Sequence, residues 1–91
     1  MRRVRTHTFN GRKYKIDIDE LEGWCDQFAN NDRFIHILGD PNTRNGLITI
    51  IHECLHAEDW TKGEAPIERT SKEIGTLLWR LGFRLLEKEN E

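Results

Sequence analysis

The chain has 91 residues, of which 36% are hydrophobic and 33% charged, and this length fits one small domain and excludes a multidomain enzyme. Fourteen Lys and Arg against sixteen Asp and Glu give a net charge of -2, which argues against a protein whose main partner is a nucleic-acid backbone. No stretch approaches the roughly 18 apolar residues of a membrane span, and the N-terminal sequence MRRVRTHTFN lacks the apolar run of a signal peptide. We therefore expect a cytoplasmic protein.

Two runs of β-branched and aromatic residues, at about 4–9 and 12–18, predict a β-hairpin. They are separated by Asn10-Gly11, the dipeptide that most readily takes the positive φ values of a type I′ turn. In the second run apolar and charged residues alternate, which gives the hairpin one face to bury and one to leave in water. The hairpin therefore needs a cover.

The middle of the chain is less regular. Residues 19–32 mix apolar side chains with a glycine and an Asn-Asn-Asp cluster, and we expect them to form mostly loop. The apolar run RFIHIL at about 33–38 is bounded by turn residues on both sides and predicts a third strand. We expect the three strands to form one antiparallel sheet.

Two helices are predicted in the second half of the chain. The first, at about 44–58, can be capped by Thr43 or Asn45 and is apolar nearly all round, so we expect it to be the central, buried helix. The second, at about 65–87, carries apolar residues at spacings of three and four and has Pro66 in its first turn. The predicted class is α+β, with the sheet packed on the first helix and the long second helix.

The central helix contains the sequence HECLH, an H-E-x-x-H motif at His52, Glu53 and His56. Residues four apart stack on one face of a helix, so both imidazoles can reach one Zn²⁺ about 2.0–2.1 Å from each nitrogen, with Glu53 placed to take a proton from water. Cys54 points about 200° around the helix from His52 and cannot be a fourth ligand. The pattern favours an open, catalytic type of zinc site over a closed structural one.

A catalytic zinc needs a third protein ligand, and acidic residues after the motif are the candidates. If the two helices form an antiparallel hairpin, the level of the metal is mirrored near Glu68, which is the preferred third ligand; Glu64 is the alternative, and Asp59 follows. The flank of the helix that carries Glu68 also carries small residues that let two backbones approach closely. These are Ser71, Gly75 and Gly82.

The remaining residues with suggestive chemistry receive no assigned role. His7 and His36 are interpreted as ordinary strand residues. Tyr14 and Arg69 have the chemistry to stabilise an oxyanion, but the sequence places neither near the metal. The three tryptophans are assigned to packing, and the two cysteines are expected to be reduced.

HECLHAEDW followed by IERTSKEIGTLLWRLGFR resembles the small HExxH proteins of bacteriophages and their bacterial hosts, which are described as minimal zincin metallopeptidases. The resemblance covers roughly residues 12–86 and includes GWCD at 23–26 and LWRLGF at 78–83. The resemblance implies a zincin-like fold with the two motif histidines as zinc ligands, the motif glutamate as general base, and a gluzincin-like acidic ligand on the next helix. An acidic pair opens that helix in the family pattern, where this chain has Glu64-Ala65-Pro66.

Two functions follow as hypotheses. The first is a zinc metallopeptidase, acting in the host cytoplasm if the chain is phage-encoded, with a peptide or protein as substrate. The second is a zinc-stabilised protein-binding module without turnover, in which the metal supplies folding energy that a small core lacks. The substrate and the oligomeric state are not specified by the sequence.

Overall fold

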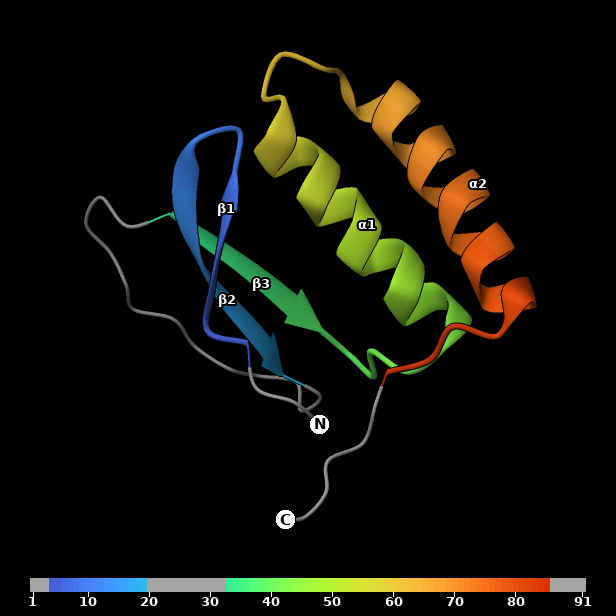
Figure 1. Cartoon of the computed structure of the whole chain (residues 1–91). Helices are drawn as coiled ribbons and strands as arrows, with labels where there is room; N and C mark the ends of the chain where they lie inside the picture. Colours follow the sequence, from blue (N-terminus) through green and yellow to red (C-terminus); the bar gives the residue numbers. More distant parts are fainter. Residues whose placement is uncertain (1–3, 20–32, 86–91) are drawn as a thin grey trace, which may run out of the picture.

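The computed structural model describes residues 4–19 and 33–85 and contains three strands followed by two helices (Figure 1). The strands are β1 (Thr6–Phe9), β2 (Arg12–Asp19) and β3 (Phe34–Leu38), and the helices are α1 (Arg44–Glu58) and α2 (Glu64–Leu81). The predicted α+β class and the order of the elements are confirmed. Apart from Asp19, which ends β2, the loop predicted at 19–32 lies outside the described residues, as does the GWCD sequence at 23–26.

The first two strands form the hairpin that the sequence predicts. Asn10 and Gly11 have φ values of 51° and 76°, so both turn residues adopt the left-handed backbone that a type I′ turn requires. β1 pairs antiparallel with β2, with Phe9 opposite Arg12 at the turn and Thr6 opposite Lys15 at the far end. β1 is shorter than the run predicted at 4–9, because pairing begins only at Thr6.

The third strand runs in the direction opposite to the one predicted. β3 pairs parallel to β2, with Lys15 beside Phe34 and Ile18 beside Ile37, so the sheet is mixed and the prediction of a fully antiparallel sheet was wrong. Parallel strands need a connection of about a dozen residues or more, and residues 20–33 supply it. The alternation of apolar residues fixes which face of a strand is buried, but it does not depend on strand direction.

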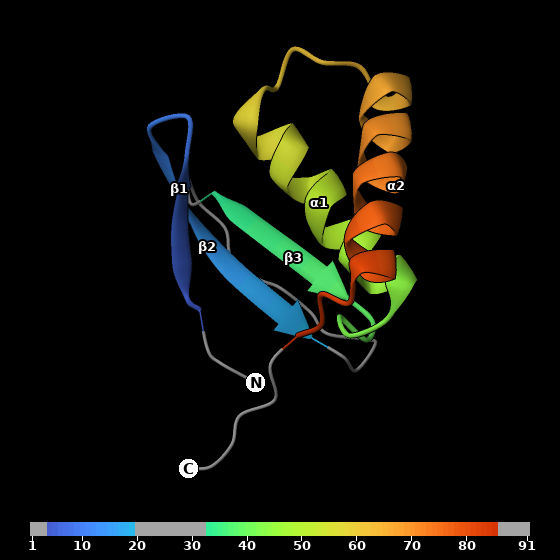
Figure 2. The same cartoon turned by 45° about the vertical axis from the view of Figure 1, so that its right-hand side comes forward.

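The core lies between one face of the sheet and α1. Tyr14 of β2 and Ile35 and Ile37 of β3 point to this face and are buried together with Ala57 of α1. Figure 2 shows α1 between the sheet and α2, and within the described residues α2 packs on α1 and not on the sheet. The prediction that the first helix is central is confirmed, but it is mostly half-buried, since only Gly46 and Ala57 of α1 are buried. The prediction that the sheet also packs on the second helix was wrong, because α1 lies between them. Neither helix of the described chain has the length and apolar character needed to cross a bilayer.

The two helices meet through small residues. The buried residues of α2 are Ile67, Ser71 and Gly75, which follow one another at intervals of one turn. A Cβ atom added at Gly75 would lie 2.6 Å from Cγ1 and 3.1 Å from Cα of Ile48, so the backbones approach as closely as they do because residue 75 has no side chain. The predicted close contact at Ser71 and Gly75 is confirmed, whereas Gly82 lies beyond the helix.

Both ends of α2 and the start of α1 have identifiable caps. The Thr43 hydroxyl accepts a hydrogen bond of 2.9 Å from the N–H of Gly46, which makes Thr43 the N-cap of α1 as predicted. The second helix was predicted to continue to about residue 87, but α2 ends at Leu81 because Gly82 turns into the left-handed region with φ of 100°. The N–H groups of Gly82 and Phe83 then bond back to carbonyls of the last turn. The periodic leucines continue past this point, but the helix does not.

Candidate metal centre

The two histidines of the HExxH motif share one face of α1. Their ring centroids lie 4.9 Å apart with an interplanar angle of 56°, as expected for side chains separated by one helical turn. Half-burial holds them in place: the side chain of His52 is 20% exposed and that of His56 is 33% exposed. Two imidazoles therefore lie side by side at the protein surface with restricted freedom.

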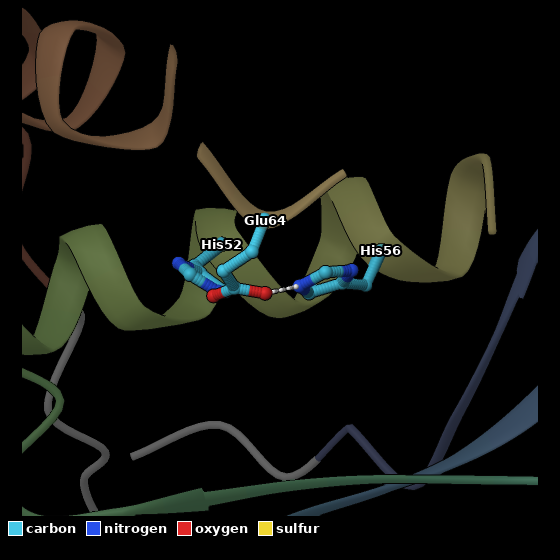
Figure 3. A group of neighbouring side chains, drawn as sticks. All are labelled: His52, His56 and Glu64. Carbon is cyan, nitrogen blue, oxygen red and sulfur yellow. Dashed lines mark hydrogen bonds and ion pairs between the residues drawn. The ribbon is translucent and has the colours of Figure 1, made fainter. Parts of the chain in front are cut away.

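A carboxylate from the next helix joins them. Glu64 is the first residue of α2, and its Oε2 lies 2.9 Å from Nε2 of His52 while its Oε1 lies 2.9 Å from Nε2 of His56 (Figure 3). Each carboxylate oxygen thus contacts one ring. The three side chains converge on one point from two helices.

The turn between the helices brings Glu64 to this position. The Asp59 carboxylate accepts hydrogen bonds from the N–H of Thr61 at 3.0 Å and from its hydroxyl at 2.6 Å, which closes the chain after α1. These two bonds lower the pKa of Asp59. Gly63 then serves as the N-cap of α2, so the helix starts with Glu64, whose carboxylate contacts both histidines. The carboxylate of Asp59, a minor candidate for the third ligand, is used in this turn.

The group has the donors of a zinc site. One nitrogen from each histidine and one oxygen of Glu64 lie within 4.8 Å of one another, and no other group of three potential ligands this close occurs within residues 4–19 and 33–85. Two imidazole nitrogens and one carboxylate oxygen are the ligand set of a catalytic zinc with one position left for water. Glu64 is 64% exposed, so this position would face solvent.

Glu68, the predicted third ligand, does not join the two histidines, and Glu64 takes that place instead. The prediction assumed a symmetric helical hairpin folded about residue 61 or 62, whereas the first residue of α2 already has its carboxylate in contact with both histidines. Glu68 lies one turn further along and lines an adjacent groove with His52 and Glu53. The alternative candidate, Glu64, is therefore the residue that joins the pair.

Two cavities flank the motif, and Glu53 borders both of them. The first, which we call the His52-side groove, runs between α1 and α2 and has a volume of about 470 Å³. The second, the His56-side cavity, lies between α1 and the sheet and has a volume of about 410 Å³. Glu53 is half-buried at the place where these spaces meet the histidines. A carboxylate there can exchange a proton with a molecule lying in either space.

Cys54, inside the motif, has no part in the group. Burial raises the pKa of its thiol, and the negative charge of Glu53 raises it further. A thiol held in its neutral form is a poor metal ligand, since the thiolate is the form that binds metals. The expectation that Cys54 is reduced agrees with its free thiol, whereas Cys25 lies outside the described residues.

The other histidines are away from the centre. His36 faces its register partner Asp17 across β2 and β3, with 3.4 Å between Nε2 and Oδ2. The ring of His7 lies tilted at 57° to that of Phe9 on β1, with ring centroids 4.9 Å apart. Neither belongs to the group of three, in agreement with their interpretation as ordinary strand residues.

Two aromatic residues that the sequence does not place near the motif, Tyr14 and Trp60, lie in the wall of the His56-side cavity. The hydroxyl of Tyr14 accepts a hydrogen bond of 2.9 Å from Nε1 of Trp60 and donates one of 3.4 Å to the carbonyl of Ala57. Trp60 nevertheless remains 60% exposed. Only the tertiary packing of β2 against α1 reveals this pair, because 46 residues separate its members.

Comparison with models of known protein families, with curated proteins and with solved structures found no match to this chain. The resemblance to the minimal zincins therefore rests on sequence motifs alone. Of these motifs, HECLH lies in α1, and LWRLGF at 78–83 forms the last turn of α2 and its C-cap.

Proposed function

We propose that the chain is a zinc-dependent metallopeptidase of the minimal zincin kind. The observation that supports this best is the convergence of His52, His56 and Glu64 from two helices, with Glu53 between the two adjoining cavities. This is the arrangement a metal-assisted hydrolase needs, because it combines three ligands, an open side and a neighbouring base.

The donor set fits zinc better than the other common divalent cations. Mg²⁺ and Ca²⁺ take oxygen ligands almost exclusively, whereas two of the three donors here are imidazole nitrogens. Zn²⁺ accepts two nitrogens and one carboxylate oxygen in a tetrahedral arrangement that leaves one position open. Residues His52, His56 and Glu64 would hold the metal from one side, and the solvent side would remain accessible.

The residues of the chain have distinct roles in the proposed reaction. When bound, zinc would polarise the scissile carbonyl and acidify the attacking water. The Glu53 carboxylate would take a proton from that water as its oxygen adds to the carbonyl carbon. It would then donate this proton to the amide nitrogen as the C–N bond breaks. Glu64 and the two histidines would keep their positions throughout, since both helices are packed against each other and α1 against the sheet.

A second candidate is a zinc-stabilised binding module without turnover, and the small core favours it. Only five hydrophobic side chains within the described residues are buried, so metal binding would add a substantial part of the folding free energy. The two candidates share the metal site and differ only in whether Glu53 has a chemical task.

The experiment that separates them is the Glu53→Gln variant, compared with wild type and with Glu73→Gln as a control on the exposed face of α2. Each protein is loaded with zinc and incubated with a mixture of internally quenched peptides. The metallopeptidase proposal expects Glu53→Gln to keep its zinc and to lose at least about 100-fold in turnover, which is the usual contribution of a general base. Peptide cleavage that is unchanged in Glu53→Gln, or absent from zinc-loaded wild type, would contradict the proposal.

A further inference from the structure

The His52-side groove has a cationic end. Its α1 wall includes residues one turn apart, from Arg44 through Ile48 to His52, and its α2 wall includes Glu68 and Lys72. A substrate chain that enters the metal centre from this side must therefore lie along α1. The wall residues then meet successive side chains of that substrate.

Arg44 and Lys72 have no acidic partner in the described chain. Arg44 donates a hydrogen bond of 3.3 Å from Nη1 to the hydroxyl of Thr76 on α2, which places its guanidinium across the far end of the groove. No carboxylate pairs with either cation within residues 4–19 and 33–85. A guanidinium has five N–H donors and binds a carboxylate through two of them, so most of its capacity remains available for a ligand.

The His56-side cavity has a different lining. Tyr14, Phe34 and Trp60 provide aromatic walls, and Arg33 is the one cation among its lining residues. Trp60 is held by its hydrogen bond to Tyr14 and by the guanidinium of Arg12, which lies 5.0 Å from its ring centroid, although the side chain is largely exposed. An exposed aromatic side chain fixed in this way can bury apolar surface of a ligand at small entropic cost.

We propose that this peptidase selects peptides with a large apolar side chain on the His56 side of the cleaved bond and an acidic side chain on the His52 side. Arg44 lies eight residues before His52 on α1, which corresponds to about 12 Å along the helix axis. An extended peptide covers that distance in about three to four residues. The acidic side chain is therefore expected three or four residues from the cleaved bond. The inference rests on the proposed function, because it identifies the substrate class of the same site.

Two carboxylates also border the groove, and they restrict where the acidic side chain can lie. Glu53 lines the groove beside His52, where a bound zinc ion would offset its negative charge, and Glu68 lies one turn before Lys72 on α2. An acidic side chain close to His52 would meet both carboxylates, whereas one at the far end meets Arg44. Because Gly75 of α2 faces Ile48, Lys72 lies closer to His52 along the groove than Arg44 does. The charge pattern thus favours the distant position and disfavours an acidic residue next to the cleaved bond.

The test measures binding without turnover. Zinc-loaded Glu53→Gln is titrated with fluorescent decapeptides that carry Phe beside the central bond and Glu four residues away from it. The Glu lies on the N-terminal side of the bond in one peptide and on the C-terminal side in another, and matching peptides carry Gln in its place. Fluorescence anisotropy gives each Kd. We expect the Glu peptide to bind about three- to tenfold more tightly than the Gln peptide in one direction, and this preference to decrease at high salt. Introducing Arg44→Gln and Lys72→Gln into the Glu53→Gln protein should reduce the preference for the Glu peptide to less than twofold. Introducing Arg33→Gln instead should leave that preference intact.

The aromatic part is tested separately. Trp60→Ala should weaken the binding of the Glu and Gln peptides by the same factor, and Trp60→Phe should retain most of the wild-type affinity for both. Equal affinities for the Glu and Gln peptides, or a preference that disappears with Arg33→Gln, would overturn the inference. Zinc content measured on the same samples distinguishes this failure from failure of the proposed function: protein that holds zinc and cleaves peptides without acidic preference refutes only the inference.

Discussion

The contact between Gly75 and Ile48 makes Gly75→Ala an informative perturbation. At an open position within a helix this substitution stabilises the folded state by about 1 kcal/mol, since Gly is that much less favourable than Ala. Here the new Cβ would lie 2.6 Å from Cγ1 and 3.1 Å from Cα of Ile48. The first contact can be relieved by a side-chain rotation, but the second involves backbone and forces the helices apart. Overpacking of this kind costs about 1–3 kcal/mol, so the net effect is a destabilisation of about 1 kcal/mol.

Thermal denaturation followed by circular dichroism measures this difference. A destabilisation of about 1 kcal/mol lowers the Tm of a domain of this size by roughly 4–8 °C, whereas the helix-propensity gain alone would raise it by a similar amount. In an Ile48→Ala background the cost of Gly75→Ala should shrink. A Tm that rises in Gly75→Ala would refute the close approach of the two helices.

Two further predictions concern the ends of α1. Thr43→Ala removes the hydroxyl that accepts a hydrogen bond from Gly46 and should lower the free energy of unfolding by about 1 kcal/mol, measured by urea denaturation, whereas Thr43→Ser should retain most of it. The pKa of Asp59 is lowered in the folded state by Thr61, so its contribution to stability is fully present above the unfolded value near about 4 and is lost as the pH falls below it. Asp59→Asn should therefore flatten the dependence of Tm on pH between about pH 4 and 2, and an unchanged slope would contradict this assignment.

Local patterns predicted most of the fold. The turn at Asn10 and Gly11 and the helix capped by Thr43 were predictable, because each depends on residues close together in the sequence. The direction of β3 was not, since the apolar alternation of Ile35 and Ile37 is the same in either direction. The end of α2 was missed because Gly82, which was expected to pack between helices, takes a left-handed conformation instead.

In the candidate site, too, the features that depend on nearby residues could be predicted, and those that depend on the path of the chain could not. His52 and His56 could be paired from their spacing, because one helical turn determines their relation. The choice between Glu64 and Glu68 depended on how far the turn after α1 carries the chain, and that turn is shaped by the hydrogen bonds of Asp59. Helical spacing carries no information about the geometry of such a turn.

The central claim is that His52, His56 and Glu64 hold a zinc ion. It is tested most directly by elemental mass spectrometry of protein purified without an affinity tag or added metal, followed by zinc titration of wild type, His56→Ala, Glu64→Gln and Glu68→Gln. We predict about one zinc per wild-type chain, its loss in His56→Ala, an affinity at least about 100-fold lower in Glu64→Gln, and near wild-type affinity in Glu68→Gln. Folded wild type that fails to bind zinc, or zinc that is retained by Glu64→Gln and lost by Glu68→Gln, would contradict it.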